Sequence, residues 1–195
     1  MPHALFVGPD SEFENLEDFV SYAKDHPGEL TVGESGALGL LMVLAFNDIA
    51  GIETTPVAYE GGGDLINALL GGHVNGASSS ITAEQELNPQ GGKALAYAAE
   101  ERIEMFSDTP TFSEQGFDLQ LGVSRVLVAP EGVPDEVVKV LTEALNELGQ
   151  GDEIKQKFDE VGTPYRYLNH EDVTEYLKKS NETILPIIEK NADDF

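Results

Sequence analysis

Short apolar runs alternate with amphipathic segments over the first two thirds of the chain. The run 4–7 predicts a strand, and Asn15 can cap a helix whose apolar residues recur at positions 16, 19, 20 and 23. The pattern then repeats, and it predicts strands at 30–33, 54–59, 74–78 and 94–98 and helices at 38–50, 65–69 and 82–87. This alternation predicts an α/β layered domain.

The last third of the chain carries mainly helical patterns. Pro134 can begin one helix, a second is expected at about 154–161, and a third at about 171–189 with a bend at Pro186. Each helix has an apolar stripe that needs a partner surface, but only 164–168 predicts a strand. We therefore expect an incomplete layer in this part of the chain.

Composition and charge narrow the function classes. The 195 residues are 41% hydrophobic, enough for a packed core and for one domain, or one complete and one incomplete domain. Lys and Arg total 11 against 36 Asp and Glu, a net charge of −25. This balance excludes a nucleic-acid partner and an anionic membrane surface. It favours a halophilic protein with a solvated acidic surface over an ordinary acidic solubility bias.

Targeting and redox signals are missing from the printed sequence. The start at Met1 lacks a basic segment followed by an apolar one, and the longest apolar run, 37–46, is too short to cross a bilayer. The expectation is a soluble chain without a targeting segment. The absence of cysteine rules out disulfides and thiolate-bound metals.

The glycine-rich loop 33–39 joins a predicted strand to a predicted helix. Its backbone N–H groups and the positive end of the helix can bind a carboxylate or a phosphate. The glycine spacing matches neither a P-loop nor a dinucleotide fingerprint. The alternative is a tight turn whose glycines only permit close packing.

Three serines, Ser78, Ser79 and Ser80, follow the strand predicted at 74–78. Ligands collect outside the carboxyl ends of strands in open α/β sheets, so these hydroxyls can donate to a carboxylate. The alternative is that they cap the helix that follows.

No arrangement of residues in the sequence indicates catalysis. The four histidines, at 3, 26, 73 and 170, lack metal-binding spacing and are expected at the surface, and no nucleophile elbow occurs. Because these patterns are missing, we expect no enzyme activity, no cofactor and no metal. The alternative, an anion-dependent enzyme, would need a titratable residue in the site, and Glu34 is the one candidate.

Several motifs occur together in a fixed order from about residue 5 to residue 190. They are the helix 15–24 ending in His26-Pro27-Gly28, the loop 33–39, Pro56–Gly61, Leu70–Asn75, Gly92–Ala96 with Glu101-Arg102, Asp108–Thr111 with Glu114–Phe117, and Ala129-Pro130 with Val133-Pro134. In this combination the chain resembles the receptors of tripartite tricarboxylate transporters, the TctC or Bug family.

The resemblance implies an extracytoplasmic solute-binding protein with a type II periplasmic-binding-protein fold. Such a receptor captures a small organic carboxylate in an interlobe cleft, presents it to membrane transporter subunits, and is not an enzyme. The chain would supply one complete lobe and part of the other. Residues 1–8 would form a crossover strand of lobe one, 9–122 lobe two, and 123–195 a crossover strand and the C-terminal helices of lobe one.

The resemblance also implies the positions that contact the ligand. Backbone N–H groups of Ser35, Gly36 and Ala37 would hold the carboxylate, with Ser78, Ser79, Ser80, Tyr59 and Gly61 lining the same cleft. The family's usual acidic residue after Val74 is Asn75 here, which leaves the ligand class open. Arg125 can pair with a carboxylate through two hydrogen bonds, or else form a surface ion pair.

An alternative function belongs to a different class. The chain can be a truncated, non-binding fragment that acts only through interaction with another chain. A homodimer would then bury the apolar helix faces that carry Val137, Leu141 and Leu145.

Overall fold

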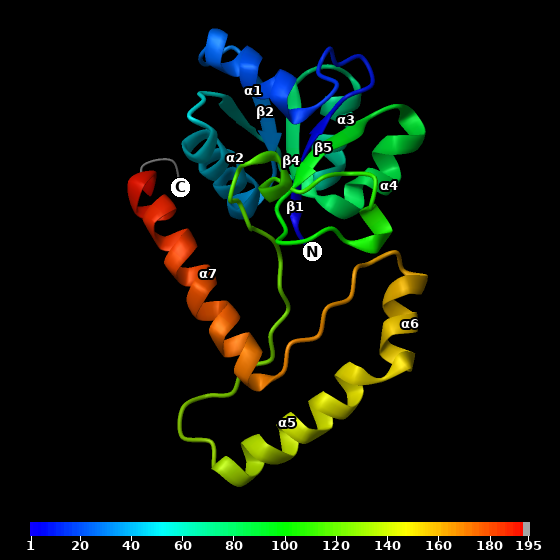
Figure 1. Cartoon of the computed structure of the whole chain (residues 1–195), viewed down its shortest axis with the longest axis vertical. Coiled ribbons are helices and arrows are strands. Elements are labelled where there is room, and N and C mark those ends of the chain that lie inside the picture. The colour runs from blue at the N-terminus through cyan, green and yellow to red at the C-terminus, as the bar shows by residue number, and fades with distance from the viewer. Residues whose placement is uncertain (193–195) are drawn as a thin grey trace. The chain divides into compact units, whose positions relative to one another are not determined.

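The computed structural model describes residues 1–192 and divides into two compact units (Figure 1). One contains Met1–Val123 together with residues 191–192, and the other contains Ser124–Lys190. No helix within residues 1–192 has both the length and the apolar character that a bilayer-crossing segment needs.

The first unit is built around a five-stranded mixed sheet with strand order β3-β2-β4-β1-β5. The strands are β1 (His3–Val7), β2 (Thr31–Glu34), β3 (Thr55–Ala58), β4 (Gly76–Ser80) and β5 (Lys93–Tyr97). β2 is parallel to β3 and β4, whereas β1 is antiparallel to β4 and β5. The carboxyl ends of the other four strands therefore meet at the edge where β1 begins.

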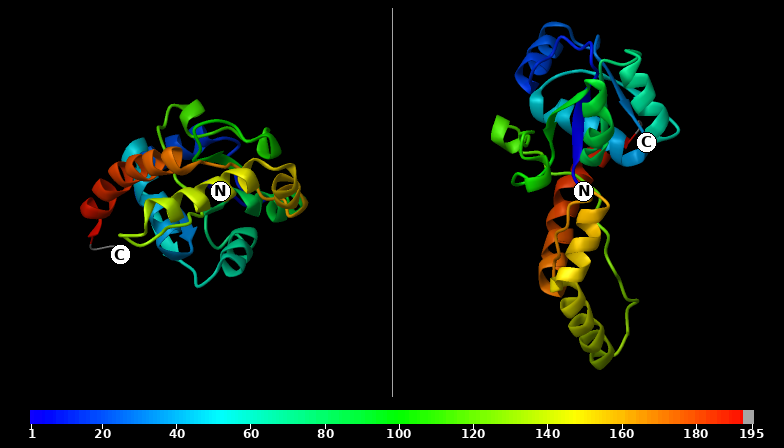
Figure 2. Two further views of the ribbon diagram at one scale, coloured as in Figure 1. Left: turned by 90° about the horizontal axis from the view of Figure 1, so that it is seen from below. Right: turned by 90° about the vertical axis from the view of Figure 1, so that its right-hand side faces the viewer.

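Helices cover both faces of this sheet (Figure 1, Figure 2). They are α1 (Leu16–Asp25), α2 (Gly36–Ala50), α3 (Gly62–Leu70) and the short α4 (Glu84–Leu87). Val32 packs with Met42 of α2, while a Cβ on the next residue, Gly33, would meet Leu65 of α3 at 2.5 Å. Because neighbouring strand residues point to opposite faces, α2 and α3 lie on opposite sides of the sheet.

The sequence explains where these helices begin and end. Asn15 caps α1 through a capping box with Asp18, and Gly51 ends α2 in the left-handed conformation, both as the sequence indicates. The apolar stripe of α3 packs into the core cluster on its side of the sheet, which contains Ala4, Phe6, Leu65, Ile66, Leu69, Val74, Ala77, Ile81, Leu87, Tyr97 and Phe106.

Several predicted boundaries are shifted by one or two residues, and the shift at β4 changes the place of the serines. β4 begins at Gly76 instead of Val74, because the Asn75 side chain accepts hydrogen bonds from the backbone N–H and the hydroxyl of Thr31, both at 2.9 Å. The three serines therefore belong to the strand.

The second unit contains α5 (Asp135–Gln150), α6 (Asp152–Glu160) and α7 (His170–Lys190). The strand predicted at 164–168 is wrong, since these residues form no strand. Instead the Tyr165 hydroxyl donates to the Gly149 carbonyl at 2.8 Å, and the Tyr167 hydroxyl donates to Asn146 Oδ1 at 2.7 Å. Within residues 124–190 the helices have no sheet to cover, as predicted.

Residues 1–8 place β1 between β4 and β5 in the sheet of the first unit. Their role as a crossover strand of another lobe stays a prediction, as do the lobe boundaries at 9–122 and 123–195.

Candidate functional site

The carboxyl edge of the sheet gathers most of the predicted site residues. β2 and β3 are in register up to the pair Glu34 and Ala58, so the loops that follow them leave the same edge side by side. One loop leads into α2 and the other into α3, on opposite faces of the sheet. Ligands in α/β proteins bind outside such strand ends, where adjacent loops diverge.

The start of α2 is an uncapped helix N-terminus. Ser35 occupies the N-cap position with extended backbone, but its side chain makes no capping hydrogen bond, and the first turn holds no acidic residue. Gly36 and Ala37 are exposed, and Gly36 has a φ of 72°, which favours glycine. The first backbone N–H groups of α2 therefore lack a side-chain acceptor and can bind an anion.

Tyr59 and Gly61 connect β3 to α3 beside this loop. The Tyr59 N–H donates to the Glu34 carbonyl at 2.8 Å, and the Tyr59 ring packs against Gly33, where a Cβ would lie 3.1 Å from Cε2. Gly61 is the N-cap residue of α3 and provides no side-chain cap. A second helix N-terminus thus begins at the same edge, with Asp64 in its first turn.

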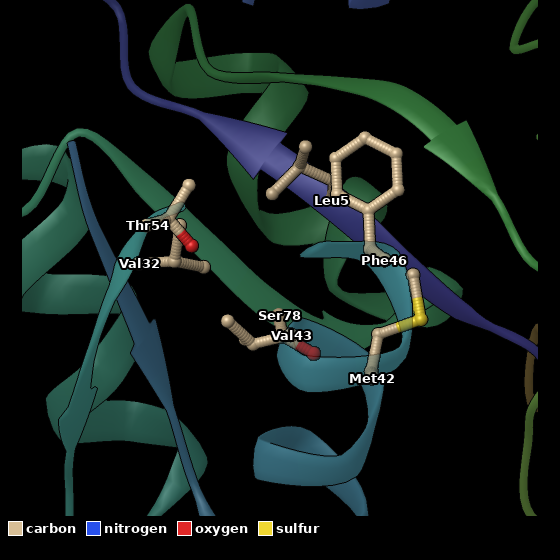
Figure 3. A pocket seen from close by; sticks show the side chains of 7 residues that line it. All are labelled: Leu5, Val32, Met42, Val43, Phe46, Thr54 and Ser78. Atoms are coloured by element: carbon tan, nitrogen blue, oxygen red, sulfur yellow. The ribbon is translucent and has the colours of Figure 1, made fainter. Parts of the chain in front are cut away.

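The serines of β4 point to alternate faces of the sheet. Ser78 is 1% exposed, and its Oγ lies 3.4 Å from Nδ1 of His3. It lines a cavity of about 10 Å³ beneath α2, together with Leu5, Val32, Met42, Val43, Phe46 and Thr54 (Figure 3). A water molecule alone needs roughly 10–15 Å³, so this cavity has no room for a carboxylate.

Ser79 and Ser80 are partly exposed at the end of the strand. Ser80 Oγ lies 3.1 Å from Oγ1 of Thr82. Ser80 precedes the 3-10 turn η1 (Ile81–Ala83) without a side-chain capping bond, so the capping interpretation of this serine is wrong. Arg125 is exposed and belongs to the second unit, and its role stays a prediction.

The burial of two residues at this edge was missed by sequence reasoning. Glu34, the last residue of β2, is 5% exposed, and burial raises the pKa of its carboxyl group. His3 was expected at the surface but is buried in β1, and burial lowers its pKa to about 4. Both residues lie directly next to a predicted apolar strand in the sequence, and this position was the one signal that could have indicated their burial.

A larger cavity, of about 290 Å³, lies at the opposite edge of the sheet. It is lined by Gly8, Pro9, Asp10, Ser11, Glu12, Phe13, Leu69, Leu70, Gly72, Val74 and Asn75. It shares no residue with the predicted carboxylate site. Among residues 1–192, no cluster of His, Asp and Glu side chains is arranged to hold a metal ion.

The mixed sheet, with helices on both faces and two uncapped helix N-termini at its carboxyl edge, has the architecture of a solute-binding receptor of the periplasmic-binding-protein type. The chain belongs to the TctC family, because the model of the tripartite tricarboxylate transporter family receptor matches residues 1–192. This confirms the resemblance and the fold class. The family consists of transporter receptors and not of enzymes.

Relatives and solved structures agree with this assignment. The "UPF0065 protein in gbd 5'region" of Cupriavidus necator is 28% identical over 189 residues, which are 95% of this chain and 58% of the relative. A TctC solute-binding protein from Polaromonas is 26% identical with a TM-score of 0.87, and the match covers 97% of this chain and 66% of that one.

MatC from Rhodopseudomonas palustris, solved with bound malate, is 26% identical with a TM-score of 0.61, over 83% of this chain and 56% of MatC. The chain thus spans about half the length of the curated relatives it matches.

Proposed function

We propose that this chain is the part of an extracytoplasmic receptor that binds a small carboxylate and presents it to the membrane subunits of a tripartite tricarboxylate transporter. The observation that carries the proposal is the uncapped N-terminus of α2 at the carboxyl edge of the sheet. The backbone N–H groups of Ser35, Gly36 and Ala37 would hold the carboxylate there. The malate bound to MatC supports a small carboxylate as the ligand class.

The neighbouring residues would complete the contact surface. Gly61 offers the second helix N-terminus, Tyr59 forms a wall next to it, and Ser79 and Ser80 bring hydroxyls to the end of β4. Ser78 would act from beneath α2 because it is buried. Arg125 stays a proposed ligand contact, and an opposing lobe is proposed to close the cleft over the ligand.

Affinity in this proposal comes from directed donors and not from net charge. A chain with a charge of −25 repels an anion at long range. Salt screens that repulsion beyond roughly 8–10 Å, whereas N–H donors at the end of a helix act in direct contact. Binding should therefore persist, or strengthen, as the salt concentration rises.

The test is residue-resolved NMR of the 15N-labelled chain, since amide shifts also detect weak binding. Malate should shift the amide resonances of Ser35, Gly36 and Ala37, whereas the uncharged dimethyl ester of malate should leave them in place. Malate-induced shifts that are absent, or confined to lysine and arginine side chains, would contradict the proposal.

A matched pair of variants tests the role of one donor. Ala37→Pro removes the Ala37 N–H within the first helical turn, where proline is tolerated, and Ala37→Ser keeps it. A hydrogen bond to a charged group contributes about 1.5–3 kcal/mol, so the proline variant should bind malate at least about tenfold more weakly. The serine variant should bind like the parent chain.

One observation favours the second candidate function, an interaction chain. Apolar side chains of the second unit are exposed, among them Val140 at 64% and Leu148 at 57%. Light scattering after size-exclusion chromatography should show a dimer if a second copy covers these faces, and Val140→Glu should then restore the monomer. A monomer that binds malate would reject this candidate.

A further inference from the structure

A row of buried polar side chains crosses the α2 face of the sheet near its carboxyl edge. It consists of Glu34 on β2, Ser78 on β4 and His3 on β1, and all three are more than nine-tenths buried. The parallel register Gly33↔Ala77 places the next pair, Glu34 and Ser78, side by side. The Ser78 hydroxyl in turn lies 3.4 Å from His3.

The carboxyl group of Glu34 lies beneath the first turn of α2. A Cβ on Gly39, in that turn, would be 3.2 Å from Cβ of Glu34 and 3.3 Å from its Oε2. Among the described residues, this Oε2 has no hydrogen-bond partner. The carboxyl oxygen therefore uses none of the free N–H groups of α2, and an unpaired charge at this depth is costly.

Few other charged or titratable groups surround Glu34. His3 on β1 is neutral near pH 7, because burial lowers its pKa to about 4. α2 carries Asp48 in its last turn and no acid in its first, and β3 carries no titratable residue. The adjoining loop contributes Tyr59 and Glu60, and α3 contributes Asp64. Burial alone raises the pKa of Glu34. Its protonation state is therefore open to change by a further charge at the start of α2.

We propose that Glu34 makes carboxylate binding at the α2 N-terminus proton-linked, so that an anion bound there holds Glu34 in its neutral form. The inference rests on the proposed function, because it assumes that a carboxylate occupies the first turn of α2. Two negative charges in one poorly solvated site disfavour each other, and Glu34 is the partner that can be neutralised. Linkage is reciprocal, so protonation of Glu34 must raise the affinity for the anion.

The experiment follows the Glu34 carboxyl carbon by NMR in the 13C-labelled chain, from pH 4 to pH 8, with and without malate. Saturating malate should move the Glu34 titration midpoint upward by about one pH unit. The malate dissociation constant is measured from the Gly36 and Ala37 amides. It should be about tenfold higher at pH values above the Glu34 titration midpoint than at pH values below it. Glu34→Gln should keep only the pH dependence that the carboxyl groups of malate impose, so that it lacks the tenfold change attributed to Glu34.

Glu84→Gln is the matched control, because Glu84 is also buried, also has an unpartnered Oε2, and packs away from α2 beside Thr109 and Asn88. It should keep the pH dependence of the parent chain. Malate binding with an unmoved Glu34 midpoint would overturn the proton linkage alone. No malate-induced shift in the parent chain at any pH would overturn the proposed function together with this inference.

Discussion

The two units contain helices of similar amphipathic pattern, but only the first unit buries them. In that unit α1 and α3 insert Leu16, Phe19 and Leu65 into the cores on the two faces of the sheet. In the second unit, within residues 124–190, α6 and α7 bury no residue, and α5 buries only Gly149. An amphipathic sequence thus specifies a helix and the face it offers, while burial of that face requires a partner layer.

The strongest test of this contrast replaces one leucine in each unit. Leu65 of α3 is fully buried, so Leu65→Ala should lower the free energy of unfolding by about 2–5 kcal/mol. Leu148 of α5 is 57% exposed, and Leu148→Ala should cost about 1 kcal/mol or less. Urea unfolding followed by circular dichroism measures both, and equal losses would break the comparison.

The pH dependence of stability should reveal the buried His3 of the first unit. Its pKa is lowered from 6.5 to about 4 by burial, so the unfolded chain binds the proton more tightly than the folded one. Stability should therefore fall as the pH drops from 6.5 towards 4, by roughly 3 kcal/mol at about 1.4 kcal/mol per pKa unit. His3→Gln should flatten this slope in urea unfolding at a series of pH values.

The exposed His26 provides the control for this measurement. His26→Gln removes an exposed histidine that lies 3.5 Å from Glu29, and the loss of stability attributed to His3 should persist in this variant. A loss that persists in His3→Gln and disappears in His26→Gln would contradict the assignment.

A glycine marks the one tightly packed point of α5. A Cβ at Gly149 would overlap the ring of Tyr167, whose hydroxyl binds Asn146. Gly149→Ala should displace this ring and destabilise the second unit by about 1–3 kcal/mol. The amides of α5 should then exchange faster with solvent while those of the first unit are unaffected. Gly132→Ala, without atoms near the added Cβ, controls for the loss of a glycine, although its φ of 87° adds local strain.

Much of the fold could be predicted because its signals are local. The stripe of α1, the capping box of Asn15 and the terminal Gly51 each act within a few residues of the helix they define. The start of β4 could not be predicted, because it depends on the bond between Asn75 and Thr31, 44 positions apart in the sequence.

The candidate site also combines features that local sequence predicts with features that depend on distant contacts. The glycine spacing of 33–39 predicted a helix N-terminus with free N–H groups, and α2 begins there. The burial of Glu34 and His3 was not predicted, because it follows from α2 packing over β2 and from β1 lying between two other strands. Local pattern therefore located the loop, while tertiary packing determined which charges lie beneath it.

The smallest expected effect compares the same helix cap in the two units. Asn15 Oδ1 accepts from the Asp18 N–H at 3.0 Å at the start of α1, and Asn169 Oδ1 accepts from the Glu171 and Asp172 N–H groups at 2.9 Å at the start of α7. Replacing either asparagine by alanine should cost about 1 kcal/mol of helix stability.

Because α1 is packed against the sheet, Asn15→Ala should lower the urea midpoint of the whole first unit. Because the side chains of α7 are not buried, Asn169→Ala should only speed hydrogen exchange in the first turn of α7. A fall in the urea midpoint of the first unit with Asn169→Ala would show that the two units unfold together.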